Sequence, residues 1–289
     1  MRTFYYVHTG HRIGLDRFRR ATTILRALND DSITLLASDF RIAHEGRHFG
    51  VNNCVGLDVV RNIPQIAHHG DKIIFDSEEA NPIMLDDMRS FFSKFIRVSD
   101  ASNDIKEKNE YLISPYLEGE GICTTYIVDD KYFGTFKKTT KIAFFFGDDD
   151  YEKDLEKNLD FIEGLDVSLQ LGFYYFLDYE DMLKDKFKNH FEFEEYDEMI
   201  TSSEILLTAS PQAVLESLAS GGKPIYFQRA DYTDHFNTLF IQLNIPIIYD
   251  YDNKALSDIL SMIADIKYQK LEQKNHDATS CLQKYLNQP

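Results

Sequence analysis

The alternation of short strand-forming runs with longer helical patterns constrains the fold of this chain more than any other feature. Ile33–Ala37 and Ile142–Phe146 are typical of buried strands, and residues 15–28 place their apolar side chains at mostly helical spacings. Strand and helix patterns follow one another in this way along most of the sequence. Such a βαβα order predicts a parallel sheet with helices on both faces.

The order is interrupted between residues 101 and 121, which are polar and loop-like, and it resumes at Lys141. For a chain of 289 residues this predicts two Rossmann-like α/β domains facing a cleft, residues 1–139 and 140–289. The second domain is expected to end in a long polar helix from about Lys254 towards Leu286. Because ligands of doubly wound sheets bind at the carboxyl ends of the strands, the loops after the strands are the candidate sites.

The charge of the chain narrows the class of partner. It holds 31 basic and 48 acidic residues, a net charge of −17. Such a chain repels phosphate backbones and anionic lipid, so we expect no nucleic-acid partner and no electrostatic attachment to membranes. Residues 1–71 differ from the rest, with nine Arg, no Lys, only seven acidic residues and six of the nine His. This asymmetry indicates an anion-handling region in the first quarter.

The three cysteines, Cys54, Cys123 and Cys281, are far apart and odd in number. They predict neither a disulfide framework nor a zinc site, and they favour a reducing cytoplasm. The first residues form a strand-like run without the apolar core of a signal peptide, and no apolar stretch approaches the span of a bilayer. We therefore expect a cytoplasmic protein with no integral membrane segment.

The first candidate site is the turn between the first strand and the first helix. Its glycines permit close backbone approach, and the following helix offers N–H groups to an anion. Its candidate residues are Gly10, His11, Arg12, Gly14, Asp16 and Arg17. The alternative is a plain β-to-α turn with a solvated arginine face. Helical spacing puts Arg17 and Arg20 on one side, and we expect Arg19 to be solvated.

The second candidate is the loop Thr208-Ala209-Ser210 and the helix after it. Ser210 is a suitable N-cap and Pro211 a suitable first helical residue, so the helix amides point into the loop, where a diphosphate could rest. Glu216 lies about one and a half turns further on, among apolar neighbours, and its carboxylate can accept two ribose hydroxyls. The alternative is an exposed helix glutamate.

The third candidate is Gly147 with the three acids that follow it, Asp148, Asp149 and Asp150. One of these acids is expected to cap the next helix. A hard cation is the alternative, but acids directly after a strand more often form a solvated helix start. We therefore expect no metal and no other cofactor.

In their order and spacing, these segments resemble a family related to the GT-B glycosyltransferases. The family includes the spore-coat polysaccharide "predicted glycosyltransferases" and the UDP-sugar hydrolase of pseudaminic acid biosynthesis. The resemblance covers nearly the whole chain and is carried by residues 13–20, 73–76, 145–150, 208–216 and 222–224. It implies a uridine nucleotide in the second domain, with Glu216 on the ribose and Thr208–Ser210 near the diphosphate.

The chain departs from the family pattern at three places. Arg17 stands where the hydrolases have their catalytic histidine, and an arginine cannot act as a general base near neutral pH. Asp76-Ser77-Glu78 replaces an Asp-His-Tyr sequence, so an active-site aromatic is missing. Asp148 follows Gly147 where a second glycine is usual, and its carboxylate would repel a diphosphate.

These observations predict a metal-independent glycosyltransferase of surface-glycan synthesis, such as nonulosonic acid or flagellin-glycan synthesis. Its donor would be a UDP-sugar or another nucleotide sugar, and its acceptor a sugar or glycoprotein. His11 is the candidate base, Asp16 its orienting partner, and Arg12 and Arg17 the anion ligands. Two alternatives stay open: a UDP-sugar hydrolase of the pseudaminic acid pathway type, and a catalytically silent sugar- or nucleotide-binding protein.

Overall fold

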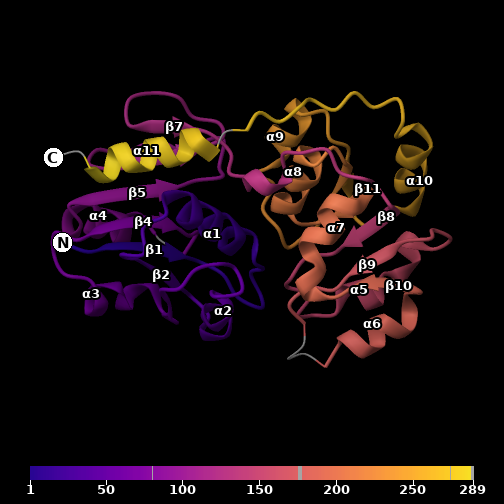
Figure 1. Ribbon diagram of the computed structural model, residues 1–289, viewed down its shortest axis with the longest axis horizontal. Coiled ribbons are helices and arrows are strands. Elements are labelled where there is room, and N and C mark those ends of the chain that lie inside the picture. The colour runs from indigo at the N-terminus through magenta and orange to yellow at the C-terminus, as the bar shows by residue number, and fades with distance from the viewer. Residues whose placement is uncertain (80, 175–177, 274, 288–289) are drawn as a thin grey trace. The chain divides into compact units, whose positions relative to one another are not determined.

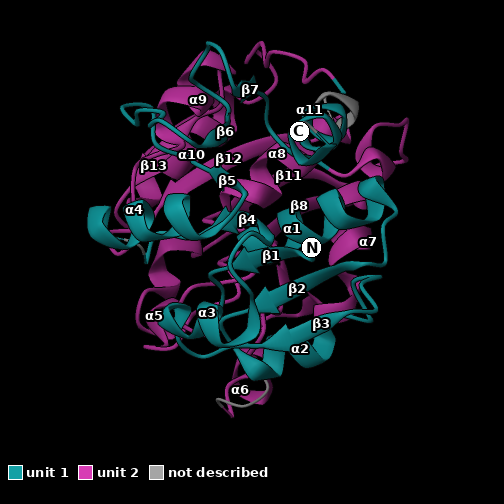
Figure 2. Ribbon diagram, turned by 90° about the vertical axis from the view of Figure 1, so that its left-hand side faces the viewer, with its two compact units in different colours: residues 1–10, 17–128, 273–289 teal, residues 11–16, 129–272 magenta. Residues whose placement is uncertain are grey.

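The computed structural model describes residues 1–79, 81–174, 178–273 and 275–287. The chain divides into two compact units (Figures 1 and 2). Unit 1 comprises residues 1–10, 17–128 and 273–289, and unit 2 comprises residues 11–16 and 129–272. Each unit therefore takes a segment from the other side of the expected boundary at residues 139 and 140.

Unit 1 is built on a seven-stranded parallel sheet with the strand order β3-β2-β1-β4-β5-β6-β7. In the central strand β1, Phe4, Tyr5, Tyr6 and Val7 are all buried, as expected for a strand covered on both faces. The strands are β1 (Thr3–Val7), β2 (Ile33–Ala37), β3 (Cys54–Gly56), β4 (Lys72–Asp76), β5 (Lys94–Val98), β6 (Tyr111–Ser114) and β7 (Ile122–Thr124).

Helices connect these strands, and the helix that begins at Pro82 shows how the sequence determines a helix start. Its N-cap Asn81 accepts a hydrogen bond from the Met84 amide, and the proline occupies its first turn. The helical elements of unit 1 are α1 (Asp16–Leu28), α2 (Phe40–Glu45), η1 (Val60–Asn62), α3 (Ile63–Ile66), α4 (Pro82–Phe91) and α11 (Asn275–Asn287).

Unit 2 holds a six-stranded parallel sheet with the order β10-β9-β8-β11-β12-β13. Its core gathers aromatic side chains such as Phe144, Phe161 and Phe227. The strands are β8 (Thr140–Phe145), β9 (Ser168–Gln170), β10 (Asn189–Phe191), β11 (Ser203–Thr208), β12 (Lys223–Gln228) and β13 (Ile247–Tyr249). The helical elements are η2 (Asp130–Tyr132), α5 (Asp154–Lys157), η3 (Leu159–Ile162), α6 (Glu180–Lys186), η5 (Phe193–Glu195), α7 (Tyr196–Ser202), α8 (Pro211–Ala219), α9 (Asn237–Gln242) and α10 (Asn253–Met262).

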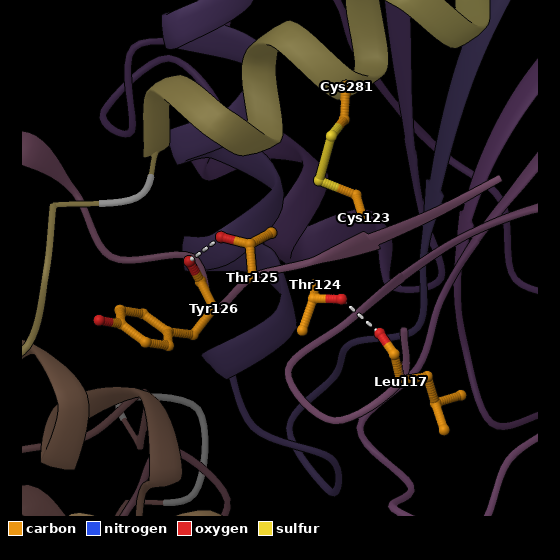
Figure 3. The surroundings of a disulfide bond; sticks show 6 residues. All are labelled: Leu117, Cys123, Thr124, Thr125, Tyr126 and Cys281. Carbon is orange, nitrogen blue, oxygen red and sulfur yellow. Dashed lines mark hydrogen bonds between the residues drawn. A yellow bond between two sulfur atoms is a disulfide. The ribbon is translucent and has the colours of Figure 1, made fainter. Parts of the chain in front are cut away.

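The two Rossmann-like α/β domains that the sequence predicts are thus confirmed, with three local corrections. The loop-like stretch before residue 121 contains the strand β6. The single helix expected from Lys254 to Leu286 is two helices, α10 and α11, and the second belongs to unit 1. A disulfide joins Cys123 of β7 to Cys281 of α11 (Figure 3). The expectation of no disulfide is wrong because the fold brings together two cysteines that lie 158 residues apart.

None of the helices in the described part of the chain has the length and apolar character needed to cross a membrane.

Candidate functional site

In unit 2, the strands β8, β11 and β12 are neighbours, and the residues just beyond their carboxyl ends form a polar cluster. Gly147 and Asp149 follow β8, Ser210 follows β11, and Arg229 follows β12. Residues 11–16 belong to the same unit and add Asp16. We call this group the unit 2 strand-end cluster. It lies where doubly wound sheets bind their ligands.

The centre of this cluster is a buried ion pair between Asp149 and Arg229. Arg229 Nη1 donates to Asp149 Oδ1 at 3.0 Å, and the Tyr232 hydroxyl donates to the same oxygen. The other edge of the guanidinium binds Asp231, with Nε to Oδ1 at 3.0 Å and Nη2 to Oδ2 at 2.6 Å. Burial raises the pKa of Asp149 to about 6, although Arg229 acts in the opposite direction. Asp149 can therefore exchange a proton near neutral pH.

Two of the predicted glycines lie against Asp149. Gly147 has a φ of 124°, and a Cβ atom there would lie 3.0 Å from Asp149 Oδ1. Gly14 has a φ of 85°, and its Cβ would lie 3.6 Å from the same oxygen. The left-handed backbone at both positions favours glycine. The structure therefore brings together two residues that are 133 positions apart in sequence (147 − 14).

The N-terminus of α8 carries the predicted capping residue and a second carboxylate. Ser210 accepts the Ala213 amide at 3.0 Å, as an N-cap should. The Ser210 hydroxyl in turn donates to Asp16 Oδ1 at 2.6 Å, and the Gln212 amide donates to Asp16 Oδ2 at 3.1 Å. A carboxylate of the chain itself thus occupies the helix end that the sequence assigns to a diphosphate. Thr208 and Ala209, just before it, are fully buried.

Glu216 is buried within α8, with 2% of its surface exposed, so the alternative of an exposed glutamate is wrong. The Tyr196 hydroxyl donates to Glu216 Oε2 at 2.7 Å, and the Gln212 side-chain amide donates to Oε1 at 2.8 Å. Both carboxylate oxygens are therefore satisfied by the chain. A ribose would have to take over these hydrogen bonds.

The three acidic residues that follow Gly147 have different surroundings. Asp150 accepts the amides of Asp154 at 2.6 Å and Leu155 at 3.2 Å, the first two residues of α5, although the N-cap position itself is occupied by Lys153. Asp148 is buried, with 3% of its surface exposed, and Asp149 and Asp150 are buried too, so the expectation of a solvated helix start is wrong. Within the described ranges, no three His, Cys, Asp or Glu side chains gather in a way that could hold a metal ion.

His11 and Arg12 both lie against Tyr151. The centroids of the His11 and Tyr151 rings are 5.4 Å apart, and the Arg12 guanidinium lies 3.8 Å from the Tyr151 centroid. Asp16, the predicted partner of His11, uses its carboxylate for Ser210 and Gln212, as described above. Gly10 is buried in unit 1.

A second polar cluster lies in unit 1, beyond the carboxyl ends of β1 and β4. Arg17 forms an ion pair with Glu78, and its Nε lies 3.7 Å from Asp76 Oδ1. Arg17 and Glu78 are two residues at which the sequence departs from the expected family pattern. The structure pairs them with each other.

Arg20 lies on the same side of α1 as Arg17, as helical spacing predicts, and it also binds Asp76, with Nη2 to Oδ1 at 2.6 Å. Its Nη1 donates to Asp100 Oδ1 at 2.6 Å. Arg19 is buried, with 6% of its surface exposed, so the expectation that it is solvated is wrong. The rest of the chain therefore covers both the side of α1 that carries Arg20 and the side that carries Arg19.

His8 follows β1 directly and belongs to this unit 1 cluster. Its Nε2 atom lies 3.9 Å from Glu79 Oε1, and its buried Nδ1 atom has no hydrogen-bond partner among the described residues. Burial lowers the pKa of His8, and Arg17 adds to this effect while Glu79 opposes it. The imidazole is therefore largely neutral at pH 7, as a general base must be.

Three residues of these clusters were not predicted from the sequence. They are Arg229 and Tyr232 in unit 2, and His8 as a candidate base in unit 1. A positional signal was available, because Arg229 and His8 are each the first residue after a buried strand. The ion pair of Arg229 with Asp149 spans 80 residues and has no local pattern.

Two Rossmann-like units with parallel sheets define the GT-B-like class of fold. No protein-family model and no curated protein sequence matches the chain. Among solved structures, the UDP-GlcNAc 2-epimerase of Methanocaldococcus jannaschii in complex with UDP-GlcNAc and UDP is similar over 99% of this chain and 100% of that one, with 12% identity and a TM-score of 0.64.

Two further structures show the same likeness. HepE of Anabaena in complex with UDP matches over 99% of this chain and 94% of its own, with 10% identity and a TM-score of 0.56. The spinosyn rhamnosyltransferase SpnG complexed with spinosyn aglycone matches over 100% of this chain and 97% of its own, with 9% identity and a TM-score of 0.55. At such low identity the likeness shows the fold.

Proposed function

We propose that the protein is a metal-independent glycosyltransferase that uses a nucleotide-sugar donor, most simply a UDP-sugar, in the synthesis of a surface glycan. The observation that carries this proposal is the unit 2 strand-end cluster, with Gly147 and the N-terminus of α8, together with the buried Glu216 further along the same helix. The proposal gains support from the fold, because similar structures carry UDP or UDP-GlcNAc. A cytoplasmic location belongs to the same proposal, but the cysteines no longer support it, because Cys123 and Cys281 form a disulfide.

The donor would bind in unit 2 by exchanging hydrogen bonds that the chain now makes with itself. Its diphosphate would replace the Asp16 carboxylate at the N-terminus of α8, where the helix end favours an anion. Its ribose hydroxyls would replace Tyr196 and Gln212 as the hydrogen-bond donors to the Glu216 carboxylate. Loop residues Thr208–Ser210 would lie beside the phosphates.

The acceptor hydroxyl would lose its proton to a histidine. We propose His11 as this base, and Asp16 as its orienting partner once a diphosphate has displaced the Asp16 carboxylate from α8. Arg12 and Arg17 would bind anionic groups of the donor or the acceptor. His8 is the competing base, supported by its neutral imidazole beside Glu79. The leaving diphosphate would be stabilised by the end of α8.

A catalytically silent binding protein is the second candidate, and a specific observation favours it. The unit 2 strand-end cluster offers two groups to an anion, and carboxylates of the chain already bind both. Arg229 binds Asp149 and Asp231. The N-terminus of α8 binds Asp16. The hydrolase alternative is disfavoured, because the Arg17 and Glu78 pair stands in place of its histidine and tyrosine.

Calorimetric titration with UDP, UMP and CMP separates these functions. We expect UDP to bind, and Glu216→Gln to weaken binding by roughly 1–3 kcal/mol, because a charge-assisted hydrogen bond to the ribose is lost. Glu163→Gln, at an exposed glutamate of the same unit, is the matched control. Absence of nucleotide binding, or an unchanged dissociation constant in the Glu216 variant, would remove the proposed donor site.

The same preparation, supplied with a UDP-sugar, tests catalysis. We expect His11→Ala to abolish release of UDP while nucleotide affinity stays within about threefold, because a base acts on the transition state. Full activity of the His11 variant together with loss of activity in His8→Ala would transfer the role of base to His8. Nucleotide binding without turnover in the wild type would favour the silent binding protein.

A further inference from the structure

A surface cavity of about 560 Å³ in unit 1 is lined by residues of α2, of the edge strand β3 and of the loop between them. Figure 2 shows α2 and β3 in unit 1. This volume lies in the range of small-molecule sites. Its lining includes Phe40, His44, Arg47, His48 and Cys54, and it shares no residue with either strand-end cluster. The function proposed above makes no use of it.

Beside this cavity, α2 packs closely on β3. A Cβ atom on Gly56 would lie 2.2 Å from Cδ1 of Phe40, so the glycine lets the phenylalanine ring approach the backbone of the strand. Even so, 59% of the Phe40 surface is exposed. The ring therefore offers an open aromatic surface at the edge of the cavity, on which a flat apolar group can stack.

The polar lining is basic. His44 lies in the last turn of α2, Arg47 and His48 lie in the turn that follows it, and all three side chains are exposed. Glu45 Oε2 lies 2.6 Å from His48 Nδ1, which orients the ring so that a ligand would meet Nε2. No acidic residue lines the cavity among the residues that the structure describes, although the whole chain carries a net charge of −17.

The remaining groups add no negative charge. Burial raises the pKa of the Cys54 thiol to about 12, so it stays neutral at physiological pH. Val51 and Ala43 supply apolar contact, and Asn52 supplies an amide. The cavity thus combines one exposed aromatic ring, small apolar side chains, one arginine and two imidazoles, of which that of His48 pairs with Glu45.

We propose that this cavity is a second ligand site, which takes a small aromatic phosphate: a single aromatic or heteroaromatic ring system that carries a phosphate group. The phosphate would bind Arg47, with its planar guanidinium, and the two imidazoles. The ring would stack on Phe40. This inference does not depend on donor binding in unit 2, and each can be tested without the other.

Calorimetric titration of the full chain with phenyl phosphate, inorganic phosphate and phenol tests the site. We expect phenyl phosphate to bind saturably and more tightly than either of the other two probes. Arg47→Gln should weaken phenyl phosphate by about tenfold, the loss of one charge-assisted hydrogen bond. Phe40→Ala should weaken the binding of phenyl phosphate but leave the affinity for inorganic phosphate unchanged.

Arg61→Gln is the matched control, because Arg61 is an exposed arginine of unit 1 outside this cavity, and it should leave all affinities unchanged. Arg47 is exposed, so its variant should fold; an unchanged melting temperature verifies this. The proposal is overturned if phenyl phosphate does not bind saturably, if Arg47→Gln binds it as the wild type does, or if inorganic phosphate or phenol binds equally well.

Discussion

At the scale of single residues, the Asp16 carboxylate occupies the N-terminus of α8, where the proposed diphosphate would bind. We expect Asp16→Asn to raise the affinity for UDP by roughly three- to tenfold, because the competing carboxylate is removed from the helix N-terminus. The affinity for uridine, which has no phosphate, should not change. Calorimetry on both ligands measures this, with Asp58→Asn, an exposed acid of unit 1, as the control. An equal gain for uridine would show that the carboxylate acts by another route.

Asp149 makes the stability of the protein depend on pH. Its pKa is about 6 in the folded chain against an ordinary 3.8, so the folded state holds this proton more tightly than the unfolded state does. Stability linked to Asp149 is therefore present below pH 4 and is lost as the pH rises through 6, by about 3 kcal/mol. Asp149→Asn should remove this component. Urea unfolding at pH 4 and pH 7 tests it, and the same pH dependence in the variant would contradict it.

The chemistry of individual positions was only partly predictable. Ser210 caps its helix as predicted, because a cap depends on the few residues that follow it. The burial of Arg19 and the pairing of Arg17 with Glu78 depend on neighbours from distant segments. No spacing rule along one helix contains that information.

At the scale of elements, α11 is attached to unit 1 by packing and by the disulfide. Leu282 is fully buried, and the Tyr285 ring stacks on Tyr111 with centroids 4.3 Å apart. We expect Cys123→Ser with Cys281→Ser to lower the free energy of unfolding by roughly 2–5 kcal/mol, because the disulfide closes a long loop in the unfolded chain.

Urea unfolding without reductant measures this loss, and a thiol reductant should reproduce it in the wild type. Cys54→Ser, which leaves the disulfide intact, is the control and should change little. A wild-type protein that unfolds at the same urea concentration with and without reductant would show that the disulfide does not contribute.

Elements with a strong local pattern were predicted almost residue by residue, whereas weak ones were not. β2 has the predicted bounds, Ile33–Ala37, because it is an apolar run that the sheet buries on both faces. β6 and β7 escaped prediction, since each is only three or four residues long and lies among polar residues. For short strands, pairing with a neighbour decides the structure, and pairing is invisible in a local window.

At the scale of the whole molecule, the alternation of strands and helices was enough to predict two Rossmann-like units. It could not predict that residues 11–16 belong to unit 2 or that residues 273–289 return to unit 1. Both exchanges depend on tertiary contacts, such as those of Asp16 with α8 and of Cys281 with β7.

The return of α11 to unit 1 has a consequence for biosynthesis. A ribosome makes the chain from its first residue, and multidomain proteins commonly fold their earlier domain first. Here the sheet of unit 1 emerges early, but the helix that covers part of it is translated only after all of unit 2. During that interval the apolar surface that Leu282 and Tyr285 will cover is open on the nascent chain. The unit that is begun first is therefore finished last, and its exposed surface is where a chaperone would act.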